Sequence, residues 1–102
     1  MTEPARRVII SRRALRDLDA IWSYLAERAG LNTASDIVAE ILDSLDNLAR
    51  MPGMGHRRMD VANASYRFWT VKSYVIGYKF DARSLRVSRV VHGSRNLAPL
   101  FR

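Results

Sequence analysis

The 102-residue chain has no cysteine and no long apolar run, and each absence excludes a class of protein. Without cysteine there is no disulfide framework and no thiolate metal site. No apolar run is long enough to cross a membrane. The apolar stretch at residues 8–10, between two arginine pairs, is too short for a signal peptide. We therefore expect a cytoplasmic protein without membrane contact, and nothing in the chain calls for a cofactor or a metal ion.

Acidic residues are scarce in the second half of the chain. Residues 51–102 carry ten basic and two acidic side chains, a net charge of +8, whereas residues 1–50 carry seven basic and eight acidic ones, a net charge of −1. Fifteen of the seventeen basic residues are arginine, whose planar guanidinium pairs with carboxylates and phosphates. A solvated surface or a coding bias toward arginine explains the arginine count equally well. The uneven distribution instead favours a partner, either an acidic protein or a nucleic acid.

Two amphipathic helices are predicted in the first half. After a short strand at residues 7–10, Ser11 is a good N-cap, and apolar residues then recur at three- and four-residue spacing. A second helix with a broad apolar face begins with a cap at Asn32 or Thr33 and ends before Pro52. Because the link between the two helices is very short, we expect an antiparallel helix hairpin.

The second half has the pattern of three successive strands. Residues 66–71, 74–80 and 85–92 are rich in β-branched and aromatic side chains, and short polar links separate them. The order strand–helix–helix–strand–strand–strand predicts one α+β domain over residues 1–102, with residues 1–5 as a loose tail. The helix hairpin should pack on one face of a mainly antiparallel sheet. The residues expected to form much of the core are Leu18, Trp22, Leu25, Ile37, Ile41, Leu45, Val87 and Val91.

Short motifs occur in a fixed order along the chain. Residues 17–25 contain Asp-Leu-x-x-Ile-x-x-Tyr-Leu, and residues 48–58 contain Leu-x-x-x-Pro-x-x-Gly-x-x-Arg. The strand pair follows with Tyr-Arg-Phe-Trp at 66–69 and Tyr-x-Ile-x-Tyr at 74–78, and the chain closes on His-Gly-x-Arg-Asn-Leu at 92–97. Together these motifs resemble those of the ParE/RelE family of bacterial type II toxins over nearly the whole chain.

The resemblance implies the fold order given above and two alternative activities. RelE-like members cleave mRNA on the ribosome, whereas ParE-like members poison DNA gyrase. Both kinds of toxin are neutralised by an antitoxin whose C-terminal segment folds onto the toxin and is typically acidic, which would suit the basic half of this chain. The fold alone does not decide between the two activities.

RNA cleavage through the 2′-hydroxyl needs a base, cations on the scissile phosphate and an acid for the leaving oxygen. If the chain is an mRNA interferase, its candidate catalytic residues are Arg58, Arg67, Arg89 and His92. The resemblance implies that a nuclease of this family typically has Tyr-Arg on the third strand and a tyrosine or histidine near the C-terminus. Here Val75 follows Tyr74 in place of that arginine, and no tyrosine follows His92, so two groups of the pattern are missing. We therefore interpret His92 as a structural residue at a strand end, and we expect no catalytic residue.

A toxin that acts by protein contact needs a recognition surface, and arginine, tryptophan and tyrosine are frequent anchors of such surfaces. The candidate target-binding residues are Arg57, Arg58, Arg89, Arg95, Leu97 and Phe101, and the candidate antitoxin-binding residues are Arg57, Arg58, Arg67 and Trp69. We interpret the chain as a ParE-like toxin that inhibits DNA gyrase and is neutralised by a ParD-like or similar antitoxin. The alternatives are a ribosome-dependent mRNA endonuclease and a basic nucleic-acid-binding domain without toxicity.

Overall fold

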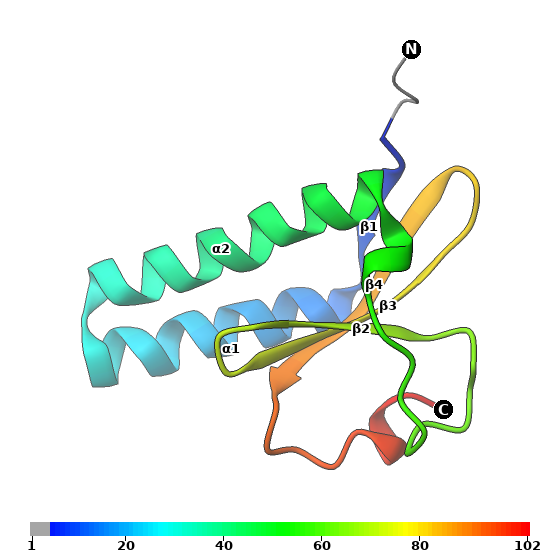
Figure 1. Cartoon of the computed structure of the whole chain (residues 1–102). Helices are drawn as coiled ribbons and strands as arrows, with labels where there is room; N and C mark the ends of the chain where they lie inside the picture. The colour runs from blue at the N-terminus through cyan, green and yellow to red at the C-terminus, as the bar shows by residue number, and fades with distance from the viewer. Residues whose placement is uncertain (1–4) are drawn as a thin grey trace.

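Two helices lie on one face of a four-stranded sheet (Figure 1). The structure, a computed structural model, describes residues 5–102, so most of the tail predicted at residues 1–5 lies outside the described residues. The elements are β1 (Arg7–Ile10), α1 (Arg12–Ala29), α2 (Leu31–Arg50), the short 3-10 helix η1 (Pro52–Met54), β2 (Arg67–Val71), β3 (Tyr74–Phe80), β4 (Ser84–His92) and a second 3-10 helix, η2 (Ala98–Leu100). The predicted α+β order and the helix hairpin are confirmed.

The sheet has the strand order β1-β4-β3-β2. Strands β2, β3 and β4 form an antiparallel meander and β1 is parallel to β4, so the sheet is mainly antiparallel, as predicted. A register shift next to Gly77 leaves Ser88 as an extra residue in β4. The short β1 pairs with β4 only from Ser84 to Val87. Beyond Val87, the outer edge of β4 therefore faces α1 instead of a strand.

The helix ends largely follow the sequence. Ser11 caps α1, because its hydroxyl accepts a hydrogen bond of 3.0 Å from the amide of Ala14. Gly30 separates the helices with a φ of 96°, and α2 begins at the next residue, so the predicted cap at Asn32 or Thr33 is wrong. Glycine adopts this positive φ without steric cost, and the chain reverses without a longer polar link. No helix in the described part of the chain is long and apolar enough to span a membrane.

The main core lies between the helix layer and the sheet. Of the residues predicted to form it, Leu18, Ile41, Leu45 and Val87 are buried there, and Leu25 and Ile37 are partly buried at its border. Trp22 is a wrong prediction, because its side chain is 37% exposed. Its indole nitrogen donates to the hydroxyl of Ser35 at 3.4 Å, on the flank where α1 meets α2. Ile21 takes the core-facing position, which turns the following residue away from the sheet.

A second apolar cluster covers the opposite face of the sheet. Its members are Val61, Phe68, Val75, Val91, Leu97 and Phe101. Val91 is thus buried, as predicted, but on the face away from the helices, because neighbouring strand residues point to opposite faces. The ring of Phe101 lies so close to Gly77 that a Cβ atom on Gly77 would overlap with the ring. The C-terminal segment is therefore an integral part of the fold.

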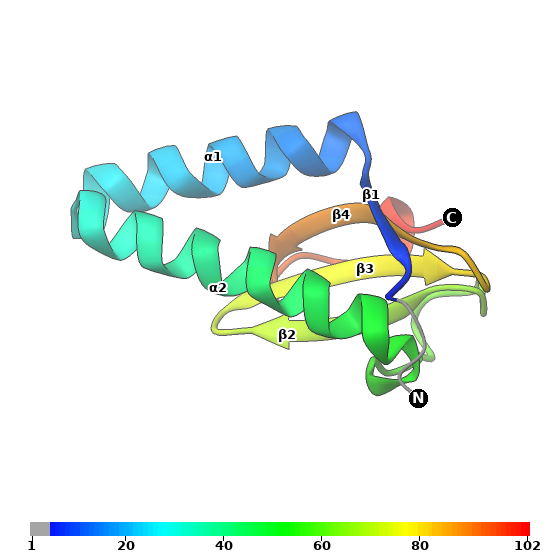
Figure 2. The same cartoon turned by 90° about the horizontal axis from the view of Figure 1, so that it is seen from above.

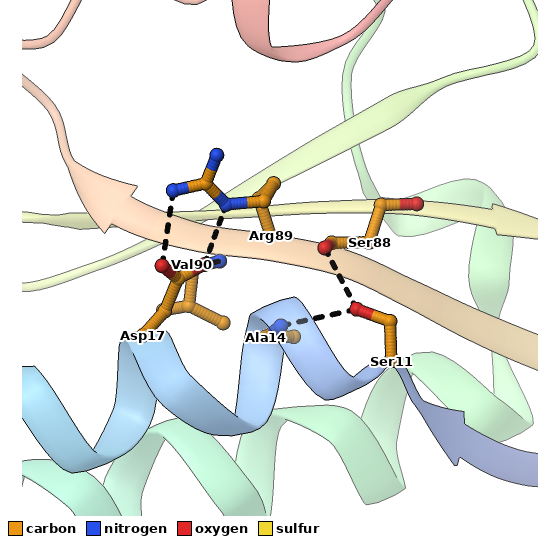
Figure 3. Close-up of polar contacts among 6 residues, drawn as sticks. All are labelled: Ser11, Ala14, Asp17, Ser88, Arg89 and Val90. Carbon is orange, nitrogen blue, oxygen red and sulfur yellow. Dashed lines mark hydrogen bonds and ion pairs between the residues drawn. The ribbon is translucent and has the colours of Figure 1, made fainter.

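Asp17 on α1 holds the outer edge of β4 (Figure 3). One carboxylate oxygen accepts hydrogen bonds from Arg89 Nε at 2.8 Å and from the Val90 amide at 3.0 Å, and the other accepts from Arg89 Nη2 at 3.0 Å. The two side chains of this ion pair are only 12% and 10% exposed. Close by, the Ser11 hydroxyl donates to the Ser88 carbonyl at 2.9 Å. These contacts provide partners for polar groups of β4 that β1 does not reach.

Removal of Asp17 should destabilise the whole domain. In Asp17→Ala the buried guanidinium of Arg89 and the amide of Val90 lose their acceptor, and we expect the free energy of unfolding to fall by about 3 kcal/mol. Chemical denaturation measures this loss. The matched control is Asp19→Ala, which removes an exposed carboxylate from the same helix. A loss no larger than that of the control would show that the pair does not hold β4 to α1.

Candidate protein-binding surfaces

Tyr78 holds the loop between α2 and β2 against the sheet. Its hydroxyl donates to the carbonyl of Pro52 and accepts a hydrogen bond of 3.0 Å from the amide of Gly55. Burial raises the pKa of the Tyr78 hydroxyl, which favours the protonated form that donates. Gly55 has no room for a side chain, because a Cβ there would overlap with the tyrosine hydroxyl. The loop is therefore fixed just before its basic residues.

Three of the predicted arginines gather around this loop. Arg67 on β2 donates to the carbonyl of Gly55 at 3.3 Å and is partly buried. Arg58 forms two hydrogen bonds with Asp60, at 3.0 and 3.2 Å, and these bonds lower the pKa of the Asp60 carboxyl. Arg57 is exposed and forms no ion pair within residues 5–102. Arg57 is thus the arginine of this group that is most available to a partner.

Trp69 and His56 stack beside these arginines, at the outer edge of β2. Their ring centroids are 6.4 Å apart and their planes differ by 14°. His56 is held there by two backbone hydrogen bonds of 2.8 Å with Phe68. Trp69 is half-buried against the main core, so part of its ring faces solvent. The four predicted antitoxin-binding residues therefore come from one loop and the strand beside it; we call Arg57, Arg58, Arg67 and Trp69 the β2-edge cluster.

The predicted target-binding residues do not form one exposed surface. Arg89 is buried in its ion pair with α1, and Leu97 and Phe101 are each 1% exposed within the second apolar cluster. The loop arginines lie beside β2, whereas Arg95 follows the end of β4, and β3 separates these two strands. The exposed arginines of this set therefore lie in two places, and Arg89, Leu97 and Phe101 are buried in the fold.

His92 ends β4 and is engaged by the turn that follows. Its Nδ1 accepts a hydrogen bond of 3.1 Å from the amide of Ser94 and lies 2.8 Å from the Ser94 hydroxyl. Because a backbone amide can only donate, the proton of the neutral ring belongs on Nε2. The ring also contacts Tyr74 edge-on, with centroids 5.7 Å apart. This arrangement agrees with the structural role predicted for His92.

Of the four residues named for an mRNA interferase, Arg58 and Arg67 lie at the same loop, but Arg89 and His92 do not join them. Arg67 pairs near the end of β3 and His92 at its start, so they lie at opposite ends of that strand. Arg89 is buried by Asp17, and Val75 is buried on the sheet face away from the helices. A phosphate clamp and an acid or base do not converge among these groups.

Two residues that position these surfaces had no role in the sequence prediction. Asp17 was part of a motif, but its partner Arg89 is 72 residues away, and one sequence gives no signal for such a pair. Tyr78 was likewise part of a motif, and its link to Gly55 spans 23 residues. The hint that the sequence does contain is the position of Asp17, whose carboxylate lies beside the apolar stripe of the first helix and therefore close to the core.

Comparison with known proteins places the chain in a family. Residues 8–97 match the family described as ParE toxin of type II toxin–antitoxin system, parDE. Toxin ParE1 of Caulobacter vibrioides is 37% identical over 87 residues, which cover 85% of this chain and 88% of that protein. Toxin ParE3 of the same organism is 28% identical over 92 residues, which cover 90% of this chain and 91% of that protein.

Two solved structures share the fold. One comes from a chromosomal ParDE toxin–antitoxin system of P. aeruginosa, with a TM-score of 0.73 and 19% identity over 86% of this chain and 96% of that one. The other comes from the RelBE2 toxin–antitoxin complex of Mycobacterium tuberculosis, with a TM-score of 0.66 and 19% identity over 86% of this chain and 91% of that one. At this identity the likeness shows the fold alone. The family match over residues 8–97 and the identity to ParE1 show more: the chain belongs to the ParE family of toxins of type II toxin–antitoxin systems.

Proposed function

We propose that this chain inhibits DNA gyrase through protein–protein contact and is held inactive by a cognate antitoxin. Family membership supports the role of toxin. The choice of gyrase over RNA rests on one observation, namely that the groups needed to cut RNA are separated from one another or already engaged. An action on gyrase would place the protein in the cytoplasm.

The chemistry of RNA cleavage explains why this observation supports the proposal. The reaction needs a base, a phosphate clamp and an acid within one site. Arg89 is neutralised by Asp17, and Val75 cannot hold a phosphate. His92 offers one free ring nitrogen, Nε2, to a reaction that needs three coordinated functions. Inhibition by contact requires no such cluster.

The exposed arginines suit recognition of a protein. Arg57 and Arg95 are exposed and form no ion pair within the described residues. Their guanidinium groups are free to form paired hydrogen bonds with carboxylates of a partner. We assign Arg95 to target contact. We assign the β2-edge cluster to an acidic segment of the antitoxin, with Arg57 as its main cation. Both assignments follow the excess of positive charge in residues 51–102.

Replacement of His92 should leave the toxin active. In His92→Gln the imidazole is lost, while a side-chain amide that can donate and accept hydrogen bonds remains at the end of β4. We expect colony survival after induction without antitoxin to match that of the unaltered toxin. Induction should activate the DNA damage response and leave ribosome-bound mRNA intact.

The matched control is His56→Gln, at the other histidine of the chain. Loss of toxicity in His92→Gln but not in His56→Gln, with both proteins folded and mRNA cut by the unaltered toxin, would favour the interferase. Normal growth during expression of the unaltered chain would instead favour a nucleic-acid-binding domain without toxicity.

Charge reversal in the β2-edge cluster should weaken the antitoxin complex. For Arg57→Glu we expect a roughly tenfold loss of affinity at low salt, shrinking as salt screens the interaction. Arg58→Glu should cost less, because the Arg58 guanidinium is already paired with Asp60. Calorimetric titration at several salt concentrations measures both effects. Arg83→Glu, in the β3–β4 turn, is the control, and an equal loss there would indicate a general charge effect.

A further inference from the structure

A basic depression lies at the corner of the sheet where β1 meets the β3–β4 turn. In both overall views this turn lies at the opposite end of the molecule from the turn between α1 and α2 (Figures 1 and 2). The depression has a volume of about 410 Å³ and is lined by residues of β1, the β3–β4 turn and the start of β4. Three of these residues are the arginines Arg7, Arg83 and Arg86, and all three are exposed.

A fourth cation stands beside the arginines. Lys79 on β3 pairs with Arg86 on β4, and Arg7 lies on β1 at the other side of β4. Each of these three cations adjoins, within its strand, a residue that packs in or against the main core: Val8, Tyr78, Leu85 and Val87. Because neighbouring strand residues point to opposite faces, the three cations share the face away from the helices. We call Arg7, Lys79, Arg83 and Arg86 the turn patch.

The cations of the turn patch are not neutralised by carboxylates. None of the four forms an ion pair within residues 5–102. Lys79 and Arg86 lie opposite each other on adjacent strands, and like charges in such a position repel. The Lys79 ammonium lies instead over the ring of Tyr66, 4.5 Å from the ring centroid. An anion bound between the two strands would relieve this repulsion.

The carboxylate of Asp81 also lines the depression, but it holds the turn together. Its Oδ1 accepts hydrogen bonds of 2.8 Å from the amides of Arg83 and Ser84, and one of 3.2 Å from the Ser84 hydroxyl. The two amides, together with the hydroxyl, lower the pKa of the Asp81 carboxyl, which therefore stays ionised at neutral pH. Four cations and this one carboxylate leave a net charge of +3.

The backbone under the turn patch is fixed to the edge strand. The amide of Arg7 donates to the carbonyl of Arg83 at 2.9 Å, and Arg6 Nε donates to the carbonyl of Asp81 at 2.7 Å. The second apolar cluster has no member, among the described residues, in β1 or in this turn. The cations therefore stand on a rigid frame at a corner that the C-terminal segment leaves open.

The side chains of the depression suit a phosphate backbone. Protein interfaces are usually anchored by aromatic side chains, and single-stranded nucleic acids stack their bases on aromatic rings. Among the described residues that line the depression none is aromatic, and Ile9 is the one large apolar side chain. Guanidinium groups form paired hydrogen bonds with phosphate oxygens, and a DNA duplex carries about one negative charge per 1.7 Å of its axis.

We infer that the turn patch binds the phosphate backbone of duplex DNA without reading its sequence. Arg83 and Arg86 contact phosphates, and Arg7 and Lys79 add positive charge beside them. The turn patch is separate from the surfaces assigned to protein partners, because β1 and β2 are opposite edges of the sheet and Arg95 follows the far end of β4. The contact would hold the toxin on the DNA that gyrase acts on, but it does not require gyrase.

The salt dependence of binding to a short, labelled DNA duplex of arbitrary sequence tests the turn patch. The variant Arg83→Gln/Arg86→Gln removes two phosphate contacts from the full chain. Because each contact releases counterions, we expect the slope of log affinity against log salt to become shallower by about 2. Affinity at low salt should fall roughly tenfold or more. Fluorescence anisotropy measures both quantities.

The matched control is Arg57→Gln/Arg95→Gln, which removes two exposed arginines outside the turn patch and changes the net charge equally. We expect it to leave the salt slope nearly unchanged. An equal loss in both variants would overturn the inference, since binding would then follow net charge alone. Failure of the unaltered chain to bind the duplex at low salt would also overturn it. Displacement of the duplex by polyglutamate as readily as by unlabelled duplex would point to an acidic protein instead.

If Arg83→Gln/Arg86→Gln lowers the thermal midpoint, NMR spectra of the unaltered chain decide. Added duplex should shift the amide signals of residues 7–9 and 79–86. Shifts confined to residues 55–58 or 92–97 would contradict the inference. Gyrase is absent from every arm, so each outcome leaves the proposed function standing.

Discussion

The hydrogen bonds and ion pair between Asp17 and the edge of β4 connect the helix layer to the sheet, at a place where no further strand pairs with β4. The short β1 covers only the first part of β4, so α1 must provide partners for the rest. The same carboxylate removes Arg89 from the surface and fixes the position of α1 above the end of the strand. The set of arginines that stays exposed for partners follows from this contact.

Both faces of the sheet are covered, which leaves its periphery for recognition. The helix hairpin covers one face, and the C-terminal segment covers the other through Leu97 and Phe101. Gly77 allows this close cover, since any larger residue would displace Phe101. The surfaces that we propose for protein partners lie in the loop beside β2 and at the end of β4.

Periodicity in the sequence was enough for the fold and insufficient for the site. The three- and four-residue spacing identified both helices and core residues such as Ile41. The core prediction for Trp22 is wrong because periodicity identifies the apolar face of a helix, whereas burial depends on which residue of that face lies against the sheet. Arg89 was expected at the surface because its partner is distant in sequence. Leu97 and Phe101 lie in a segment too short to show a pattern, so nothing in the sequence indicated that they close a second cluster.

Action by protein contact is tested most directly with purified components, in a DNA supercoiling assay with gyrase and this toxin in the absence of ribosomes. We predict that the toxin inhibits supercoiling in a dose-dependent way and that added antitoxin restores it. Full gyrase activity at saturating toxin, together with cleavage of ribosome-bound mRNA by the same preparation, would contradict the proposed mechanism.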